Sequence, residues 1–92
     1  MNKQEYQLTP LHRKILKNFC RINYNLLIKK NSDTWSTVSS SRHIYAEYKP
    51  DNILPFTLAL HSVGEFLGLI KNFHTPCISS DEKYIYIRQD NI

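Results

Sequence analysis

A short helix with two chemically opposite sides is the feature that most constrains the fold of this chain. Thr9 and Pro10 suit the N-cap and the first helical position, so the sequence predicts a helix over about residues 11–22. At 100° per residue, the apolar side consists of Leu11, Ile15, Leu16, Phe19 and Ile22. The opposite, basic side consists of Arg13, Lys14, Lys17 and Arg21. Such a helix must bury its apolar side against other elements and leave its charges in water.

The basic side carries most of the positive charge of the chain. Arg13, Lys17 and Arg21 are four residues apart, and like charges at that spacing cost a helix about 0.2–0.5 kcal/mol per pair. Residues 1–30 hold seven basic residues against one acidic residue, whereas residues 31–92 hold five against seven. This asymmetry favours a polyanionic partner, either a nucleic acid or an acidic protein surface. A solvated face that only keeps the protein in solution is the alternative.

The remaining sequence predicts short strands and one further helix. Alternating or apolar runs predict strands near residues 26–30, 34–41, 42–49, 55–60 and 84–88, with a turn at residues 79–82. Ser62 and Glu65 match the capping-box pattern that begins a helix. The apolar stripe of that helix consists of Val63, Phe66, Leu67 and Ile70. We therefore expect one α+β domain over residues 1–92, an antiparallel sheet with two helices on one face.

The patterns typical of enzymes, metal sites and membrane proteins are missing from the sequence. Both glycines, Gly64 and Gly68, fall inside the second predicted helix, so no phosphate-binding loop is expected. The four histidines do not have zinc spacing, and Cys20 and Cys77 suggest neither a metal site nor a disulfide framework. No signal peptide is evident, and no apolar run approaches the ~20 residues that cross a bilayer. We expect a cytoplasmic protein without catalytic activity, cofactor or membrane partner.

Four segments, in this order and at this spacing, resemble a single family. They are ILKNFCRIN at residues 15–23, LLIK at 26–29, IYAE at 44–47 and EFLGLI at 65–70. Together they look like the first domain of the sliding clamp of T-even-type bacteriophages, the polymerase processivity factor. The predicted turn near residues 78–82 and the strand after it continue the resemblance, which covers about residues 9–88.

The resemblance implies a ring that surrounds DNA. Clamps of this family are built from repeated domains, with two helices of each domain facing the central hole and the sheets outside. The chain would contact the phosphates of duplex DNA without reading its sequence. The resemblance assigns to the inner wall the residues Arg13, Lys14, Lys17, Arg21 and Lys71. It also implies other copies or other clamp subunits as partners, together with a DNA polymerase and a clamp loader.

The chain also departs from the family pattern. A phage clamp subunit has two such domains, and this sequence has room for one and stops before the last strand expected in it. The pocket that binds polymerase and loader tails lies near the linker between domains, so the resemblance does not carry that pocket over to these residues. We expect open sheet edges near residues 26–30 and 84–88, and open edges invite pairing with another copy.

Two other functions fit the same sequence. A clamp-derived interaction protein could cap or modulate another clamp, and the short length of the chain motivates that alternative. A small winged-helix-like module could instead bind DNA through the second helix and the hairpin that follows it. That helix is poor in the Arg, Asn and Gln side chains that read base edges, which counts against the winged-helix alternative.

Overall fold

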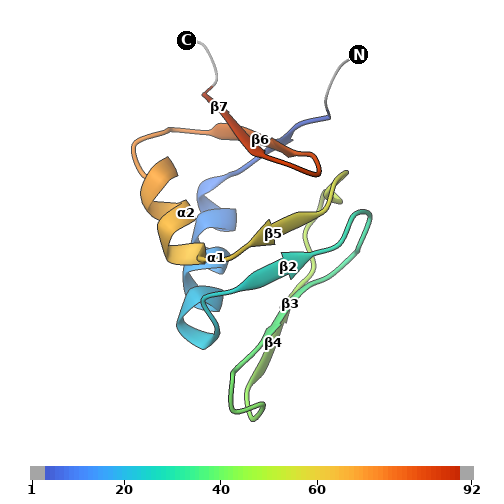
Figure 1. The fold of residues 1–92 in the computed structure, drawn as a ribbon, viewed down its shortest axis with the longest axis vertical. Coiled ribbons are helices and arrows are strands. Elements are labelled where there is room, and N and C mark those ends of the chain that lie inside the picture. The colour runs from blue at the N-terminus through green and yellow to red at the C-terminus, as the bar shows by residue number, and fades with distance from the viewer. Residues whose placement is uncertain (1–3, 90–92) are drawn as a thin grey trace.

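Two helices lie on one side of seven short strands in the computed structural model, which describes residues 4–89 (Figure 1). In chain order the elements are β1 (Tyr6–Gln7), α1 (Pro10–Ile22), β2 (Leu26–Ile28), β3 (Trp35–Val38), β4 (Tyr45–Tyr48), β5 (Leu58–Leu60), α2 (Val63–Ile70), β6 (Pro76–Ser80) and β7 (Ile85–Gln89). The α+β class predicted from the sequence is confirmed.

The strands form three antiparallel ladders within the described residues, where we expected one sheet. The ladders are β1–β6–β7, β2–β5 and β3–β4. β2 and β3 lie beside each other without a ladder between them. The Asn23 side chain, at the C-cap of α1 and just before β2, joins this end of the helix to β3, because its Nδ2 donates to the Val38 carbonyl at 3.0 Å. Within the described residues β2 and β7 each lie at the end of a ladder, as expected, and β3 lies beside the other edge of β2.

The two halves of the chain repeat one arrangement that the sequence does not reveal. The order strand, helix, strand, strand occurs first as β1–α1–β2–β3 and again as β5–α2–β6–β7. The first strand of each half pairs with the second strand of the other half, as β1 with β6 and β5 with β2. The helices run antiparallel, since Arg13 lies at the end of α2 and Cys20 lies against Gly64 at its start. The helices are thereby held side by side.

The hydrophobic core fills the space between the helix pair and the ladders. α1 buries His12, Leu16 and Phe19, and Leu16 is 0% exposed. α2 contributes Val63, Phe66 and Ile70, as its predicted stripe requires. The prediction for α1 was wrong at Leu11, which is 54% exposed. The buried stripe is centred on Leu16, so His12 takes the inward position that we expected Leu11 to occupy.

Side-chain caps begin both helices where the sequence predicts. Thr9 Oγ1 accepts a hydrogen bond from the His12 amide at 3.3 Å, and His12 Nδ1 accepts one from the Thr9 amide at 3.1 Å. This is a capping box with histidine in place of the usual Glu or Gln. At α2, Ser62 Oγ accepts from the Glu65 amide at 3.1 Å.

Neither helix within residues 4–89 has the length and apolar content that crossing a membrane requires.

We predict that Gly68→Ala raises the free energy of unfolding by about 0.5–1 kcal/mol, since glycine costs a helix interior that much relative to alanine. A Cβ at Gly68 would meet no atom within 4 Å, and its φ is not positive. Urea unfolding followed by circular dichroism measures the change. A loss of stability would contradict the open surroundings of Gly68 in this structure.

Candidate nucleic-acid interface

Three basic side chains share the outward side of α1. Lys14, Lys17 and Arg21 are all exposed, and they project within a sector of about 60° opposite the buried stripe. None of them has an ion-pair partner within residues 4–89. α1 contains no acidic residue, and Glu65 is the acidic residue of α2. The outward side of α1 is therefore a surface of unneutralised positive charge, which we call the basic face.

Arg13 uses its charge inside the domain. Its side chain is half-buried and reaches the C-terminal end of α2. Nη1 lies 3.5 Å from the Lys71 carbonyl, and Nη2 donates to the His74 carbonyl at 3.0 Å and to the carbonyl of Phe73. A cation at this end of a helix is favourable because the last carbonyls carry partial negative charge. Arg13 thus joins α1 to α2.

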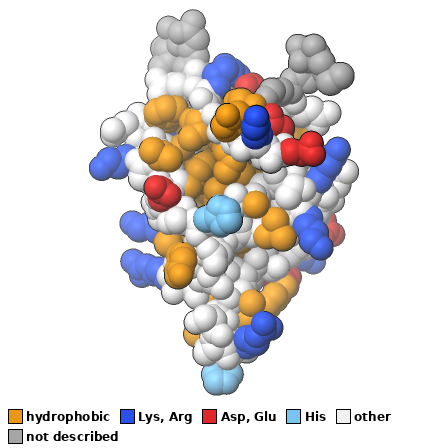
Figure 2. Space-filling view, viewed as in Figure 1, with side chains coloured by type: hydrophobic (Ala, Val, Ile, Leu, Met, Phe, Trp, Pro, Cys, Tyr) orange, Lys and Arg blue, Asp and Glu red, His pale blue; other side chains and the backbone are white. Residues whose placement is uncertain are grey.

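Lys71 lies at the C-cap of α2, exposed and next to the Arg13 guanidinium. Of the five residues predicted for the site, the structure brings Lys14, Lys17 and Arg21 onto one face and leaves Lys71 at the end of the neighbouring helix. Figure 2 shows Lys and Arg side chains along the left margin of the molecule, where Figure 1 places the helices.

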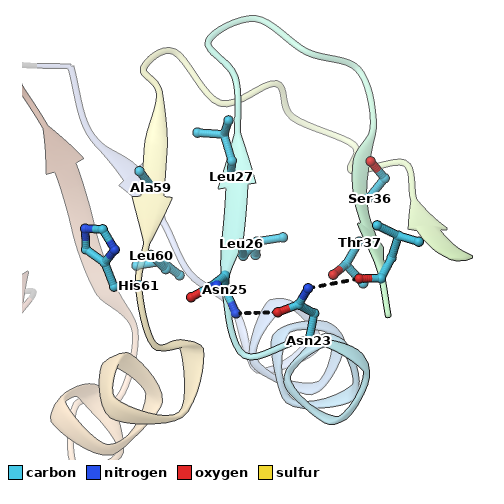
Figure 3. A pocket seen from close by; sticks show the side chains of 10 residues that line it. Asn23, Asn25, Leu26, Leu27, Ser36, Thr37, Ala59, Leu60 and His61 are labelled. Atoms are coloured by element: carbon cyan, nitrogen blue, oxygen red, sulfur yellow. Dashed lines mark hydrogen bonds between the residues drawn. The ribbon is translucent and has the colours of Figure 1, made fainter. Parts of the chain in front are cut away.

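A shallow pocket of about 420 Å³ opens on the strand side, at the seam between β2 and β3 (Figure 3). Its apolar walls come from Leu26, Leu27, Ala59 and Leu60, and Leu27 is half exposed. The Asn23 side-chain amide points toward β3, and its Oδ1 accepts a hydrogen bond from the backbone amide of Asn25 at 3.0 Å. The sequence predicted neither this pocket nor the seam.

A larger open hollow of about 970 Å³ lies between β5 and the hairpin of β6 and β7. Figure 2 shows hydrophobic side chains gathered in the upper part of the molecule, over this region. Phe56, Ala59 and Ile85 belong to its lining, with Lys83 and Glu82 from the hairpin turn. Within residues 4–89, no group of three or more His, Cys, Asp or Glu side chains is placed to hold a metal ion.

The comparisons with known proteins give no match: no family model fits the chain, and no curated protein and no solved structure is similar to it. The resemblance to phage clamps therefore depends on the sequence segments alone.

We predict that Arg13→Met lowers the free energy of unfolding by about 1–2 kcal/mol, because the carbonyls of Lys71, Phe73 and His74 lose a charged donor. Methionine keeps most of the apolar stem, so the loss reports on the guanidinium. Lys17→Met removes a charge of the same sign from the exposed side of α1 and should change stability by less than about 0.5 kcal/mol. Equal losses in the two variants, measured by urea unfolding, would contradict a structural role for Arg13.

Proposed function

We propose that this chain is a non-catalytic sliding-clamp or processivity-factor domain, which contacts the phosphates of duplex DNA through the basic face as part of a ring. The observation that carries the proposal is the position of Lys14, Lys17 and Arg21 on one exposed side of a helix whose other side is anchored in the core. We place this activity in the cytoplasm of the cell that makes the protein.

The geometry of the basic face suits a phosphate backbone. From Lys14 to Arg21 the helix advances by roughly 10 Å, and duplex DNA carries a charge about every 1.7 Å of its axis. Long Lys and Arg side chains along that length can follow several phosphates without a fixed register. Contacts of this kind position a protein on DNA and carry no sequence information. Movement along DNA needs such contacts, because a surface that bound base edges would stop at particular sequences.

The arrangement of the fold also supports the proposal. α1 and α2 lie together on one side and the strands on the other (Figure 1), as the resemblance to clamps implies for an inner wall and an outer layer. Lys71 would extend the basic face onto the second helix. Arg13, predicted for the same wall, serves in this proposal to hold the two helices together.

Ring formation needs contacts between domains, and two of the strands that end a ladder are candidates for them. β4 and β7 each lie at the end of a ladder within the described residues. A strand in that position is a template for pairing with another chain. We propose that copies of this chain, or other clamp subunits, associate there. DNA polymerase and clamp loader are proposed partners through the resemblance alone.

Two alternatives lead to different measurements. A clamp-derived protein that caps another clamp would be monomeric until it is mixed with clamp subunits. A winged-helix module would prefer particular DNA sequences, but α2 contains no Arg, Asn or Gln, and its exposed side presents Gly68 and Leu69. The sequence preference of DNA binding separates this module from a clamp.

We predict that Lys17→Glu with Arg21→Glu weakens binding to duplex DNA to the same extent on unrelated sequences. The slope of log affinity against log salt concentration should fall in magnitude by about 2, because two phosphate contacts are lost. Fluorescence anisotropy with labelled duplexes over a salt series gives both quantities.

Lys29→Glu with Lys30→Glu is the matched control for this experiment. It makes the same change in net charge in the exposed connection between β2 and β3, away from the helices (Figure 1). The control should bind DNA nearly as the wild type does, and all three proteins should have the same circular dichroism spectrum. An unchanged affinity in the α1 variant would refute the role of the basic face. Equal losses in both variants would show that net charge attracts DNA wherever the charges lie, and would also refute a specific role for the basic face.

A further inference from the structure

A buried histidine, His12, connects the start of α1 to strands of two of the three ladders. His12 is 8% exposed, and three aromatic rings surround it. The centre of its ring lies 5.4 Å from that of Tyr6 in β1, 5.3 Å from that of Trp35 in β3 and 6.5 Å from that of Tyr48 in β4. The first turn of α1 is therefore fixed to β1, β3 and β4 through one imidazole.

The hydrogen bonds of His12 require a neutral ring. Nδ1 accepts from the Thr9 amide at 3.1 Å, and a ring nitrogen that accepts carries no proton. The proton of the neutral ring is then on Nε2, 3.5 Å from the Tyr6 hydroxyl. That hydroxyl donates its own proton to the Asn52 carbonyl at 2.8 Å, so it can accept from Nε2. Protonation of Nδ1 would place a second donor against the Thr9 amide.

The surroundings of His12 favour the neutral form further. Burial lowers the pKa of His12 below its ordinary value of 6.5, and the Gln7 carbonyl and the Asp51 carboxylate oppose this only in part. The titratable groups around the ring are Tyr6 of β1, Tyr48 of β4 and Asp51 of the segment after β4, while Trp35 of β3 does not titrate. Of these groups, Asp51 alone carries a negative charge that would stabilise an imidazolium, and its effect on the His12 pKa is smaller than that of burial.

We propose that His12 is a pH switch at the first turn of α1, in which protonation breaks the capping box with Thr9 and loosens the contact of the helix with Tyr6, Trp35 and Tyr48. The neutral ring is the form that stabilises the fold. Because the folded-state pKa is lowered, this contribution is complete above about pH 6.5 and is lost as the pH falls through the folded-state pKa.

The switch stands on the geometry of His12 alone, and its effect on DNA rests on the proposed function. Acid adds positive charge to a protein and ordinarily strengthens its attraction to phosphates. Loosening of the helix that carries Lys14, Lys17 and Arg21 acts in the opposite direction. The two effects therefore differ in sign. The switch predicts that protonation of His12 weakens DNA binding, whereas added positive charge alone predicts that it strengthens binding.

The wild-type protein tests the switch directly by NMR. We expect the His12 ring to titrate below pH 6.5 and the Thr9 amide resonance to move with the same midpoint, as its hydrogen bond is lost. A ring that titrates at or above 6.5, or a Thr9 amide that does not respond to it, would overturn the proposal.

His12→Gln separates the charge of the ring from the cap, since glutamine can complete a capping box and does not titrate in this range. His43→Gln, at an exposed position before β4, is the matched control. Between pH 7.5 and 5.5, wild type and His43→Gln should lose more stability than His12→Gln. As the pH falls from 7.5 to 5.5, the DNA affinity of His12→Gln divided by that of the wild type should rise by up to about fivefold. This is the factor that corresponds to the stabilisation that one N-cap contributes to a helix.

An affinity ratio that does not change with pH would contradict the coupling of His12 to the basic face. Absence of DNA binding by every variant at every pH would refute the proposed function, and the NMR titration of the wild type would still decide the switch. The same titration decides it if His12→Gln does not fold.

Discussion

The burial of one side of α1 is the constraint on which the rest of the structure depends. Leu16 and Phe19 lie in the core with Ile28, Leu58 and Ile78 from the strands. Each of these side chains contributes about 1.5–3 kcal/mol when it is removed from water, so rotation of the helix about its axis would be costly. Fixing that rotation leaves the opposite side to the solvent, with its three charges in one row. The candidate function of α1 is thus a consequence of its packing.

The same burial brings polar groups into positions where they must be paired. Arg13, at the border of the buried side, donates to the last carbonyls around the end of α2 and couples the two helices. His12 completes the cap of α1 while its ring fills the space among three aromatic side chains. A chain with a modest core depends strongly on a few such contacts, because its total stability is small. Protonation of one buried imidazole can therefore matter to the whole helix.

Local patterns in the sequence were sufficient to predict both helices, their caps and the approximate positions of β2, β3, β4, β5 and β7. The turn predicted at residues 79–82 was wrong at Ser79 and Ser80, which pair with β7 as the last residues of β6. Thr9, Pro10 and Ser62 act on residues within one turn, so their meaning does not depend on the rest of the fold. Leu11 and His12 differ by only 100° on the helix, and hydrophobicity favoured Leu11 for the buried position. Hydrophobicity does not measure what His12 contributes, which comes from its capping hydrogen bond and its contacts with aromatic rings.

The bonds of Arg13 reach residues 58 to 61 positions away, and the seam between β2 and β3 depends on tertiary packing. No local pattern reports such contacts.

The claim that the basic faces of several copies surround one duplex is tested most directly by light scattering on a sizing column, across protein concentration, with and without DNA. We expect a defined oligomer whose mass is a multiple of 10.9 kDa and which persists on duplex DNA. A mass of 10.9 kDa at every concentration, with single chains bound to DNA, would contradict a self-assembled ring.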